Sequence, residues 1–429
     1  MGAGGKTSAL FALAGELSPP VVMTTTTHLG AWQAQLADQH QILTSPEALN
    51  ALDLSGVKTA LFTGPLGQDQ RLGGLDLHIL DALYQVCRER GYTLLIEADG
   101  ARQRPLKAPA VYEPVIPEWV EHVVVMAGLS GIGQPLAEES VHRPEIYAYL
   151  ADLPLGEVIG VEQAARVLAA PLGGLKGIPE GARRFLFLNQ AEDDLQKARG
   201  LRLANLSMDS YDRILIGSLH MPGQDGSVFS AYSKTAGIIL AAGGSVRLGQ
   251  PKQLLDWCGQ PFVAQVAQNA LVAGLDPVIV VTGAHRDSVE TALGDLPVKI
   301  VFNPDWEKGQ STSMRVGLRE LPLHCDRAMF LLSDQPQISP FLIRGLIERH
   351  NVRRGSITAP MMRERRGNPV LFGQETFGYL GSVEGDKGGR AAFNTFRVDH
   401  VPWVDDRCLL DVDQARDFEK LIDAYFGIE

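Results

Sequence analysis

Short runs of aliphatic and β-branched residues alternate along the chain with longer stretches of helical periodicity. This alternation is typical of α/β folds, in which mostly parallel strands are joined by crossover helices. In the first half we predict strands at Pro20–Thr25, Thr59–Phe62, Thr93–Ala98, His122–Ala127, Arg184–Asn189 and Arg213–Gly217. In the second half we predict them at Gly237–Ala242, Pro277–Thr282, Lys299–Phe302, Arg327–Leu332, Ser356–Ala359, Pro369–Phe372 and His400–Val404. Helices are predicted between them at Leu77–Arg90, Val161–Ala169, Phe262–Ala273, Pro340–Asn351 and Gln414–Phe426.

One segment breaks this pattern. Met221–Lys234 contains Pro, Gly and Ser without clear periodicity, and it separates two predicted strands. Such composition is typical of a boundary between domains. We therefore predict two Rossmann-like three-layer α/β domains, 1–220 and 236–429, joined by a linker at 221–235.

Composition narrows the class of protein. The 429 residues are 45% hydrophobic and 21% charged, as in globular proteins with a sizeable core. A net charge of −11 argues against a nucleic-acid partner. No apolar run reaches the ~20 residues that span a membrane, and the N-terminus lacks a signal-peptide pattern. The four cysteines show no metal-site spacing, so we expect free thiols in the cytoplasm.

The most informative motif is the segment Leu240–Lys252, LAAGGSVRLGQPK. An apolar strand there ends in small residues, which let backbone N–H groups approach phosphates closely. Arg247 and Lys252 follow and could neutralise the charge of a departing pyrophosphate. The glycines alone would equally fit an ordinary strand-to-helix turn. With both cations present, the motif favours a nucleotide site.

Four further clusters in the second half suit the same chemistry. Asp334 ends an apolar strand where α/β sheets bind ligands, and a carboxylate there suits Mg²⁺. Asp411 and Asp413 could supply another metal ligand or simply cap the last helix. Gly309–Ser313 could cap a helix or bind base and ribose, and Gly385–Arg390 could be an anion-binding turn or a surface turn.

Residues 236–429 closely resemble the molybdenum cofactor cytidylyltransferases, which are MobA-like nucleotidyltransferases. The shared motifs occur in order as LAAGGSVRLGQPKQLL, NPDWEKGQSTSMRVGL, LLSDQP, GNPVLF, GDKGG and DVDQARD. The resemblance implies transfer of CMP from CTP to the terminal phosphate of molybdopterin, with release of pyrophosphate. The product, molybdopterin cytosine dinucleotide, would serve a molybdenum hydroxylase apoenzyme as partner. No side-chain nucleophile is needed, because the attacking group is already a phosphate.

The resemblance also implies roles for individual residues. Catalysis would rest on Arg247, Lys252 and Asp334. Nucleotide binding would involve Leu240, Ala241, Ala242, Gly243, Gly244, Ser245, Thr282 and Ser313. The pterin side would be lined by Asn368, Pro369, Asp386, Gly388 and Gly389. Mg²⁺ or Mn²⁺ would be held by Asp334 with Asp411 or Asp413.

Three positions bear on how closely the chain follows this family. Ala242 favours CTP, because CTP-using members tend to read LAAG and GTP-using relatives LAGG. Leu248 stands where Met is usual, which is a conservative apolar change. Asn368 stands where His often precedes Pro, and this puts its role in doubt.

A second phosphate-binding motif opens the chain. Gly4, Gly5, Lys6 and Thr7 match the end of a P-loop, whose backbone cradles phosphates and whose hydroxyl meets Mg²⁺. No strand precedes the motif here, so either the true start lies upstream or this domain lacks its first strand. A flexible Gly-rich terminus is the alternative. A strand ending at Glu97 and Asp99 adds carboxylates on the metal side. Asn189 stands where GTPases read guanine, but Gln190 and Glu192 depart from their motif, so the base preference is open.

Residues 1–217 resemble a small family of YqeC-like proteins described as selenium-dependent hydroxylase accessory proteins. The motifs that carry this resemblance are GAGGKT, TTTTHL, EADGARQRPLKAP, GQPL with VHRPE, and FLNQAED. It implies a second site for an anionic ligand. This site would be surrounded by Glu97, Asp99, Arg102, Arg104 and Lys107, with Asp99 as a metal ligand. For the last three residues, plain surface charge is an equal alternative. His142 and Arg143 fit a helix entry better than a catalytic role.

The leading hypothesis is a two-domain maturation enzyme for molybdenum hydroxylases. Its second half makes the cytosine dinucleotide cofactor, and its first half performs a nucleotide-dependent accessory step. One alternative keeps the fold but uses GTP, or a sugar or isoprenoid phosphate as acceptor. Another is a cofactor carrier or chaperone without turnover, which Arg247, Lys252 and Asp334 disfavour for the second half. For the first half this alternative stays open, because the missing strand could leave binding without hydrolysis.

Overall fold

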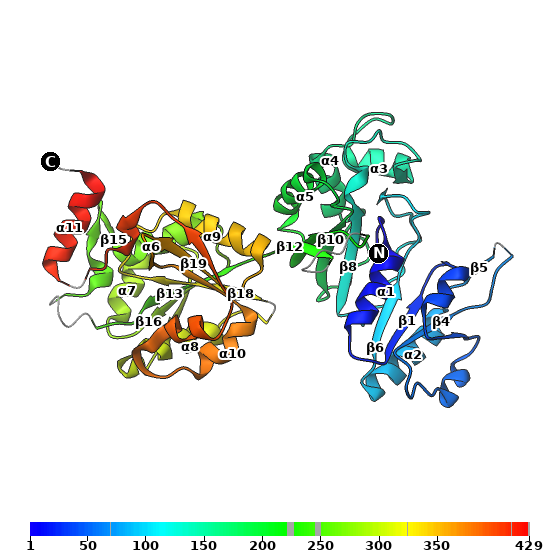
Figure 1. Ribbon diagram of the computed structural model, residues 1–429, viewed down its shortest axis with the longest axis horizontal. Coiled ribbons are helices and arrows are strands. Elements are labelled where there is room, and N and C mark those ends of the chain that lie inside the picture. The colour runs from blue at the N-terminus through cyan, green and yellow to red at the C-terminus, as the bar shows by residue number, and fades with distance from the viewer. Residues whose placement is uncertain (69, 221–226, 245–249, 324, 413, 428–429) are drawn as a thin grey trace. The chain divides into compact units, whose positions relative to one another are not determined.

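The chain forms two compact units, Met1–Tyr232 and Ser233–Glu429 (Figure 1). The computed structural model describes residues 1–68, 70–220, 227–244, 250–323, 325–412 and 414–427. Each unit has its own sheets and its own hydrophobic clusters. No helix among these residues is long and apolar enough to cross a membrane.

The first unit contains two four-stranded sheets. One has the order β3 (Gln39–Ile42), β4 (Thr59–Thr63), β1 (Val21–Thr25), β6 (Thr93–Glu97), and its pairings are parallel. The other has the order β12 (Val228–Ser233), β11 (Arg213–Gly217), β10 (Arg183–Asn189), β8 (His122–Gly128). Gly2 forms a parallel bridge to Met126 of β8, which places the start of the chain beside that strand.

Helices cover these sheets, and the unit also contains two short strand pairs. The helices are α1 (Lys6–Glu16), α2 (Leu77–Arg90), α3 (Pro144–Ala151), α4 (Val161–Ala169) and α5 (Asp194–Ser207). The short strands are β2 (Leu29–Gly30) with β5 (Arg71–Leu72), and β7 (Leu106–Lys107) with β9 (Val141–His142).

The second unit is built on one eight-stranded, mostly parallel sheet. Its order is β17 (Lys299–Phe302), β16 (Val278–Thr282), β13 (Ala236–Ala241), β18 (Arg327–Leu332), β21 (Val370–Gly373), β19 (Ile357–Met362), β20 (Arg365–Arg366). The remaining strand, β22 (Val398–Pro402), pairs with β19. The helices are α6 (Phe262–Val272), α7 (Arg286–Leu293), α8 (Gln310–Arg319), α9 (Pro340–Arg353), α10 (Phe377–Ser382) and α11 (Ala415–Phe426).

Alternate side chains of β13 explain the three layers of this unit. Ile239 and Ala241 belong to the cluster that includes side chains of α6 and α9. Ile238, which points to the other face, packs with Met314 of α8 and Leu380 of α10. Such a strand is apolar on both faces because helices cover both sides of a parallel sheet.

The predicted strands and helices are confirmed, with small shifts at their ends. Leu77–Arg90 and Val161–Ala169 are helices with the predicted bounds. The linker prediction needs a correction, because Val228–Ser233 forms strand β12 next to β11. Polar and apolar residues alternate in SVFSAYS, and this pattern indicates a strand. The Pro and Gly residues just before it made the segment resemble a linker. Residues 221–226 lie outside the described parts of the chain.

Candidate functional site

The strand ends of the second unit meet at one edge of its sheet. Leu240 of β13 pairs with Leu332 of β18, and Ala241 pairs with Thr282 of β16. Because these strands are parallel, the residues that follow them emerge on the same side. The loop at Ala242–Gly244 and the carboxylate of Asp334 therefore lie at this edge.

The glycine loop is held by a buried amide. Gln253, only 3% exposed, donates from Nε2 to the carbonyls of Ala241 at 3.2 Å and Gly243 at 2.7 Å. A Cβ at Gly244 would lie 3.2 Å from the ring of Trp306, so a side chain there would require the ring to shift. These contacts fix the backbone where the sequence predicts phosphate binding. The predicted residues Ser245 and Arg247 lie outside the described residues.

Lys252 and Asp334 face each other across this edge. Lys252 opens a short 3₁₀ turn, η4 (Lys252–Leu254), and its Nζ lies 3.8 Å from Asp334 Oδ2. Both side chains remain partly accessible, at 17% and 25%. A cation and a carboxylate at this distance are spaced to bind a phosphate and its metal ion together.

The segment before α11 approaches Asp334 through Gln335. Gln335 Nε2 donates to Asp411 Oδ1 at 2.7 Å. This bond joins the loop after β18 to the segment before α11. Gln335 Oε1 is buried and accepts no hydrogen bond from the described residues. A water on a bound cation would satisfy that atom.

This donor set fits a magnesium ion. Mg²⁺ takes one or two protein carboxylates and completes its shell with water and phosphate oxygens. Asp334 and Asp411 provide such carboxylates, whereas Asp413 is outside the described parts. Among the described residues no cluster of three or more His, Cys, Asp or Glu could hold a metal by protein ligands alone.

The predicted ribose-side hydroxyls are already engaged within the protein. Ser313 Oγ accepts from Asn303 Nδ2 at 2.9 Å, and Thr282 Oγ1 donates to the carbonyl of Val301 at 3.3 Å. Both side chains are buried, Thr282 completely. They shape the wall of the site, and Asn303, which the sequence analysis missed, organises it.

Strand direction places the remaining predicted residues. Because β21 runs antiparallel to β18, with Val370 opposite Phe330, Asn368 and Pro369 enter at the Asp334 edge. Gly388 and Gly389 pack against α8 within η7 (Gly385–Asn394), where a Cβ at Gly389 would lie 2.8 Å from Phe372. Of Asp386 only the backbone, within η7, is described.

The Gly4–Thr7 segment of the first unit adopts a tight loop before α1. Gly4 and Gly5 have φ of 79° and 110°, a region that favours glycine. Lys6 lies 4.0 Å from Glu97 and 3.6 Å from Asp99, and Thr7 Oγ1 donates to Glu97 Oε2 at 2.8 Å. The Lys and Thr of the motif therefore meet the carboxylates of Glu97, at the end of β6, and of Asp99, just after it.

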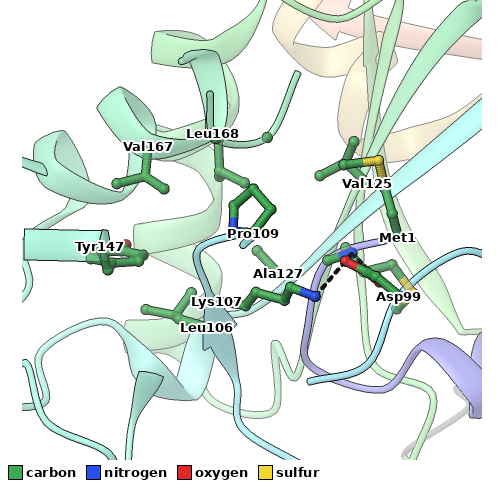
Figure 2. A pocket seen from close by; sticks show the side chains of 14 residues that line it. Met1, Asp99, Leu106, Lys107, Pro109, Val125, Ala127, Tyr147, Val167 and Leu168 are labelled. Atoms are coloured by element: carbon green, nitrogen blue, oxygen red, sulfur yellow. Dashed lines mark hydrogen bonds and ion pairs between the residues drawn. The ribbon is translucent and has the colours of Figure 1, made fainter. Parts of the chain in front are cut away.

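Asp99 belongs to a buried charge network. It accepts from the backbone N–H of Gly2 at 3.0 Å and forms an ion pair with Lys107 at 2.8 Å (Figure 2). Burial alone would raise the pKa of Asp99, but the charges of Lys6, the amino terminus and Lys107 lower it below its ordinary value. Lys107 also pairs with Glu113, which binds Arg143.

These contacts correct the roles expected for two residues. Asp99 and Lys107 line a cavity of about 30 Å³, together with apolar side chains such as Tyr147 and Val167 (Figure 2). That volume holds little more than a water molecule. Asp99 is thus occupied by cations in a closed space, and Lys107 is structural. Glu97, which faces the larger pocket described below, is the better candidate metal ligand.

Asn189, expected where GTPases read guanine, is also structural. Its Nδ2 donates to the carbonyl of Gly4 at 2.7 Å, and its Oδ1 accepts from Leu219 N at 3.0 Å. The side chain is 1% exposed. Both ends of the amide are used, so Asn189 holds the glycine loop and does not present itself to a base.

Comparisons with known proteins separate the two halves. The family model "YqeC protein" matches residues 1–145, and the model "MobA-like NTP transferase domain" matches residues 237–401. The uncharacterized protein YqeC of Escherichia coli is 32% identical over 197 residues, covering 44% of this chain and 74% of the relative. Nicotine blue oxidoreductase of Paenarthrobacter nicotinovorans is 30% identical over 197 residues, covering 43% and 95%.

Two further proteins are similar to part of this chain. The purine catabolism protein PucB of Bacillus subtilis is 30% identical and covers 36% of this chain and 78% of the relative. The crystal structure of Rv0371c from Mycobacterium tuberculosis is 28% identical, with a TM-score of 0.41, and covers 44% of this chain and 98% of its own.

Proposed function

Because this chain belongs to the YqeC family through its first unit and to the MobA-like NTP transferases through its second, we propose that it transfers CMP from CTP to molybdopterin. The second unit is a nucleotidyltransferase domain. The choice of CTP and of a molybdopterin phosphate as acceptor is our proposal, and it makes molybdopterin cytosine dinucleotide and pyrophosphate the products.

One observation carries the proposal. A glycine loop pinned by Gln253 and a Lys252–Asp334 pair at 3.8 Å lie together at the carboxyl edge of the sheet. Open α/β sheets bind ligands at this edge. The loop supplies backbone donors, Lys252 supplies positive charge, and Asp334 supplies a ligand for a metal.

The reaction requires that the two substrates be aligned and that the charge on the phosphates be neutralised. The acceptor phosphate attacks the α-phosphorus of CTP, a new P–O bond forms, and the bond to pyrophosphate breaks. Lys252, with Arg247, would neutralise the leaving group, and Asp334 with Asp411 would hold Mg²⁺ or Mn²⁺. The ion, when bound, neutralises charge on the phosphate oxygens.

The preference for cytosine rests on Ala242. Its methyl group stands where guanine-using relatives have glycine, and Gly283 lies against it, with an ideal Cβ at 2.8 Å from Ala242 Cβ. Asn368, Pro369 and the Gly388–Gly389 turn would face the pterin.

For the first unit we propose a nucleotide-dependent accessory role at the Gly4–Thr7 loop. Thr7 with Glu97 would hold the metal, since these two groups already contact each other. Lys6, which lines the same pocket, would exchange its present contacts with Gly2 O and Glu97 for phosphates. The two units would serve one client, a molybdenum hydroxylase apoenzyme.

Pyrophosphate release by the full-length protein tests the main proposal. The protein is incubated with Mg²⁺, molybdopterin, and either CTP or GTP. We expect release with CTP and at least about tenfold less with GTP, a difference near 1.4 kcal/mol. Release with GTP alone would refute the argument from Ala242. No release with either nucleotide, in folded protein, would leave the carrier alternative.

The substitution Asp334→Asn tests the metal assignment within the same assay. Because the amide is neutral, we expect release to fall at least about 100-fold, as for loss of one transition-state electrostatic contact. Asp295→Asn, at an exposed turn, is the matched control and should leave the rate unchanged. An active Asp334→Asn protein would remove Asp334 from the metal site.

A further inference from the structure

A large pocket in the first unit extends well beyond the Gly4–Thr7 loop. Its volume is about 600 Å³, within the range of small-molecule sites. The loop and α1 contribute Gly4, Gly5, Lys6, Thr7 and Ser8 to its lining. The segment from Glu97 to Arg104, at and after the end of β6, contributes further lining residues, and the rest come from two groups of segments far apart in the sequence.

The topology puts these groups on opposite sides of the loop. The loop lies between β6 and β8, because Gly2 contacts Asp99 after β6 and bridges Met126 of β8. On one side, Gln190 and His220 follow β10 and β11. On the other side, His28 and Trp32 follow β1, and Arg71 lies on β5, which pairs with β2. We call the set His28, Trp32 and Arg71 the Trp32 wing.

The Trp32 wing is held in place by contacts within the fold. Gly30 of β2 pairs with Arg71 of β5, and Arg71 Nη2 donates to the carbonyl of His28 at 3.0 Å. The indole of Trp32 lies over Gly30, where an added Cβ would be 2.9 Å from Nε1. Trp32 lines the pocket and is nevertheless 63% exposed, so its ring is accessible to a ligand.

Charge in the pocket favours an anion. Its lining carries four cationic side chains, Lys6, Arg71, Arg102 and Arg104, against one carboxylate, Glu97. Arg102 and Arg104 form no ion pair or side-chain hydrogen bond within the described parts of the chain. A single nucleotide at the loop would use one side of the pocket for its base and would leave the other side open.

We propose that the Trp32 wing is a second ligand subsite, which takes a flat ring bearing a phosphate group next to a nucleotide at the Gly4–Thr7 loop. The ring stacks on Trp32, and Arg71 meets the phosphate. The subsite deepens the nucleotide role proposed for the first unit and rests on it. The pocket would then hold a nucleoside triphosphate at the loop and the phosphorylated ring compound beside it. Lys6, Thr7 and Glu97 would lie next to both ligands.

Binding of 1-naphthyl phosphate to the full-length protein tests the subsite. This probe has a flat ring and a phosphate, and its affinity is measured by ligand-observed NMR titration. We expect Trp32→Ala and Arg71→Ala each to weaken binding about tenfold, whereas Trp32→Phe, which keeps a stacking face, stays within about threefold. Naphthol and inorganic phosphate, which each lack one half of the probe, should bind at least about tenfold more weakly.

Two matched variants control for surface changes. Tyr149→Ala removes an aromatic ring that is 82% exposed and does not line the pocket, and Arg88→Ala removes an exposed cation on α2. Both should leave the affinity unchanged. Unchanged affinity in Trp32→Ala, or equal loss in Tyr149→Ala, would overturn the subsite.

A competition experiment separates this inference from the nucleotide role. Binding of MgATP is measured first by calorimetry, and the probe titration is then repeated at saturating MgATP. We expect the probe affinity to change by less than about threefold. Displacement by MgATP would overturn the subsite, since the probe would then occupy the loop. If neither MgATP nor MgGTP binds, the nucleotide role fails, and the alanine variants alone decide the subsite.

Discussion

At the scale of residues, buried amide side chains hold both glycine loops. Gln253 donates to Gly243 O in the second unit, and Asn189 donates to Gly4 O in the first. An amide can satisfy backbone groups on both strands of a loop, and leaving those groups unpaired would cost about 1–3 kcal/mol each. The amides therefore fix the backbone of the loops at which we propose phosphate binding.

Gln335 leads to a prediction about metal dependence. Its Nε2 binds Asp411, while its buried Oε1 has no partner in the described parts of the chain. We expect Gln335→Met to raise the Mg²⁺ concentration for half-maximal pyrophosphate release about 10–100-fold, as when an outer-shell ligand is lost. Gln268→Met, on the exposed side of α6, should not change it. An unchanged Mg²⁺ dependence in both variants would exclude Oε1 from the metal site.

His142 leads to a prediction about pH. Burial, aided by the nearby charges of Arg143, Lys107 and Arg102 and opposed by Glu113, lowers the pKa of His142 from 6.5 to about 4. The unfolded chain then binds more protons than the folded chain between these values, so stability falls as pH drops from 6.5 toward 4.

Denaturant unfolding at pH 7 and pH 5 measures the effect. His142→Gln, which cannot titrate, should lose less stability on acidification than the parent protein. The exposed His78→Gln variant serves as control and should follow the parent. Equal acid sensitivity in His142→Gln and the parent would show that another group controls it.

At the scale of elements, one reversed strand decides which loops meet. The pattern of β21 predicts a strand, but its direction depends on its neighbours, and it runs antiparallel to both β18 and β19. This reversal brings Asn368 to the edge where Asp334 lies. The turn at Gly388–Gly389 is fixed in a similar way, because it packs on α8 and Phe372.

The Gly389 contact can be tested by stability. In Gly389→Val the side chain would collide with Phe372 and Met314, whose atoms lie 2.8 Å and 3.4 Å from an ideal Cβ. We expect a loss of about 1–3 kcal/mol in the free energy of unfolding, typical of overpacking. Gly381→Ala, in α10 with no atom within 4 Å of its Cβ, should be neutral or stabilising. A neutral Gly389→Val would mean that η7 adjusts freely.

At the scale of the whole molecule, the division into two units predicts separable activities. The second unit, residues 233–429, contains the glycine loop, Lys252, Asp334 and Asp411. We expect this fragment alone to release pyrophosphate within about threefold of the full-length rate. Lys6→Ala in the full-length protein should leave that rate unchanged as well. A rate that falls with Lys6→Ala would show that the first unit contributes to the second unit's chemistry.

The sequence by itself determined the α/β class, the strands and helices, the glycine loops and the families of both halves. These features follow from local periodicity and from ordered motifs, which adjacent residues encode. Only the tertiary structure decided that Asp99, Lys107 and Asn189 are occupied by partners within the fold, and that Trp32 and Arg71 line a pocket. Such assignments depend on contacts between distant segments and on strand direction, because these decide which polar side chains are enclosed within the fold and which line a pocket.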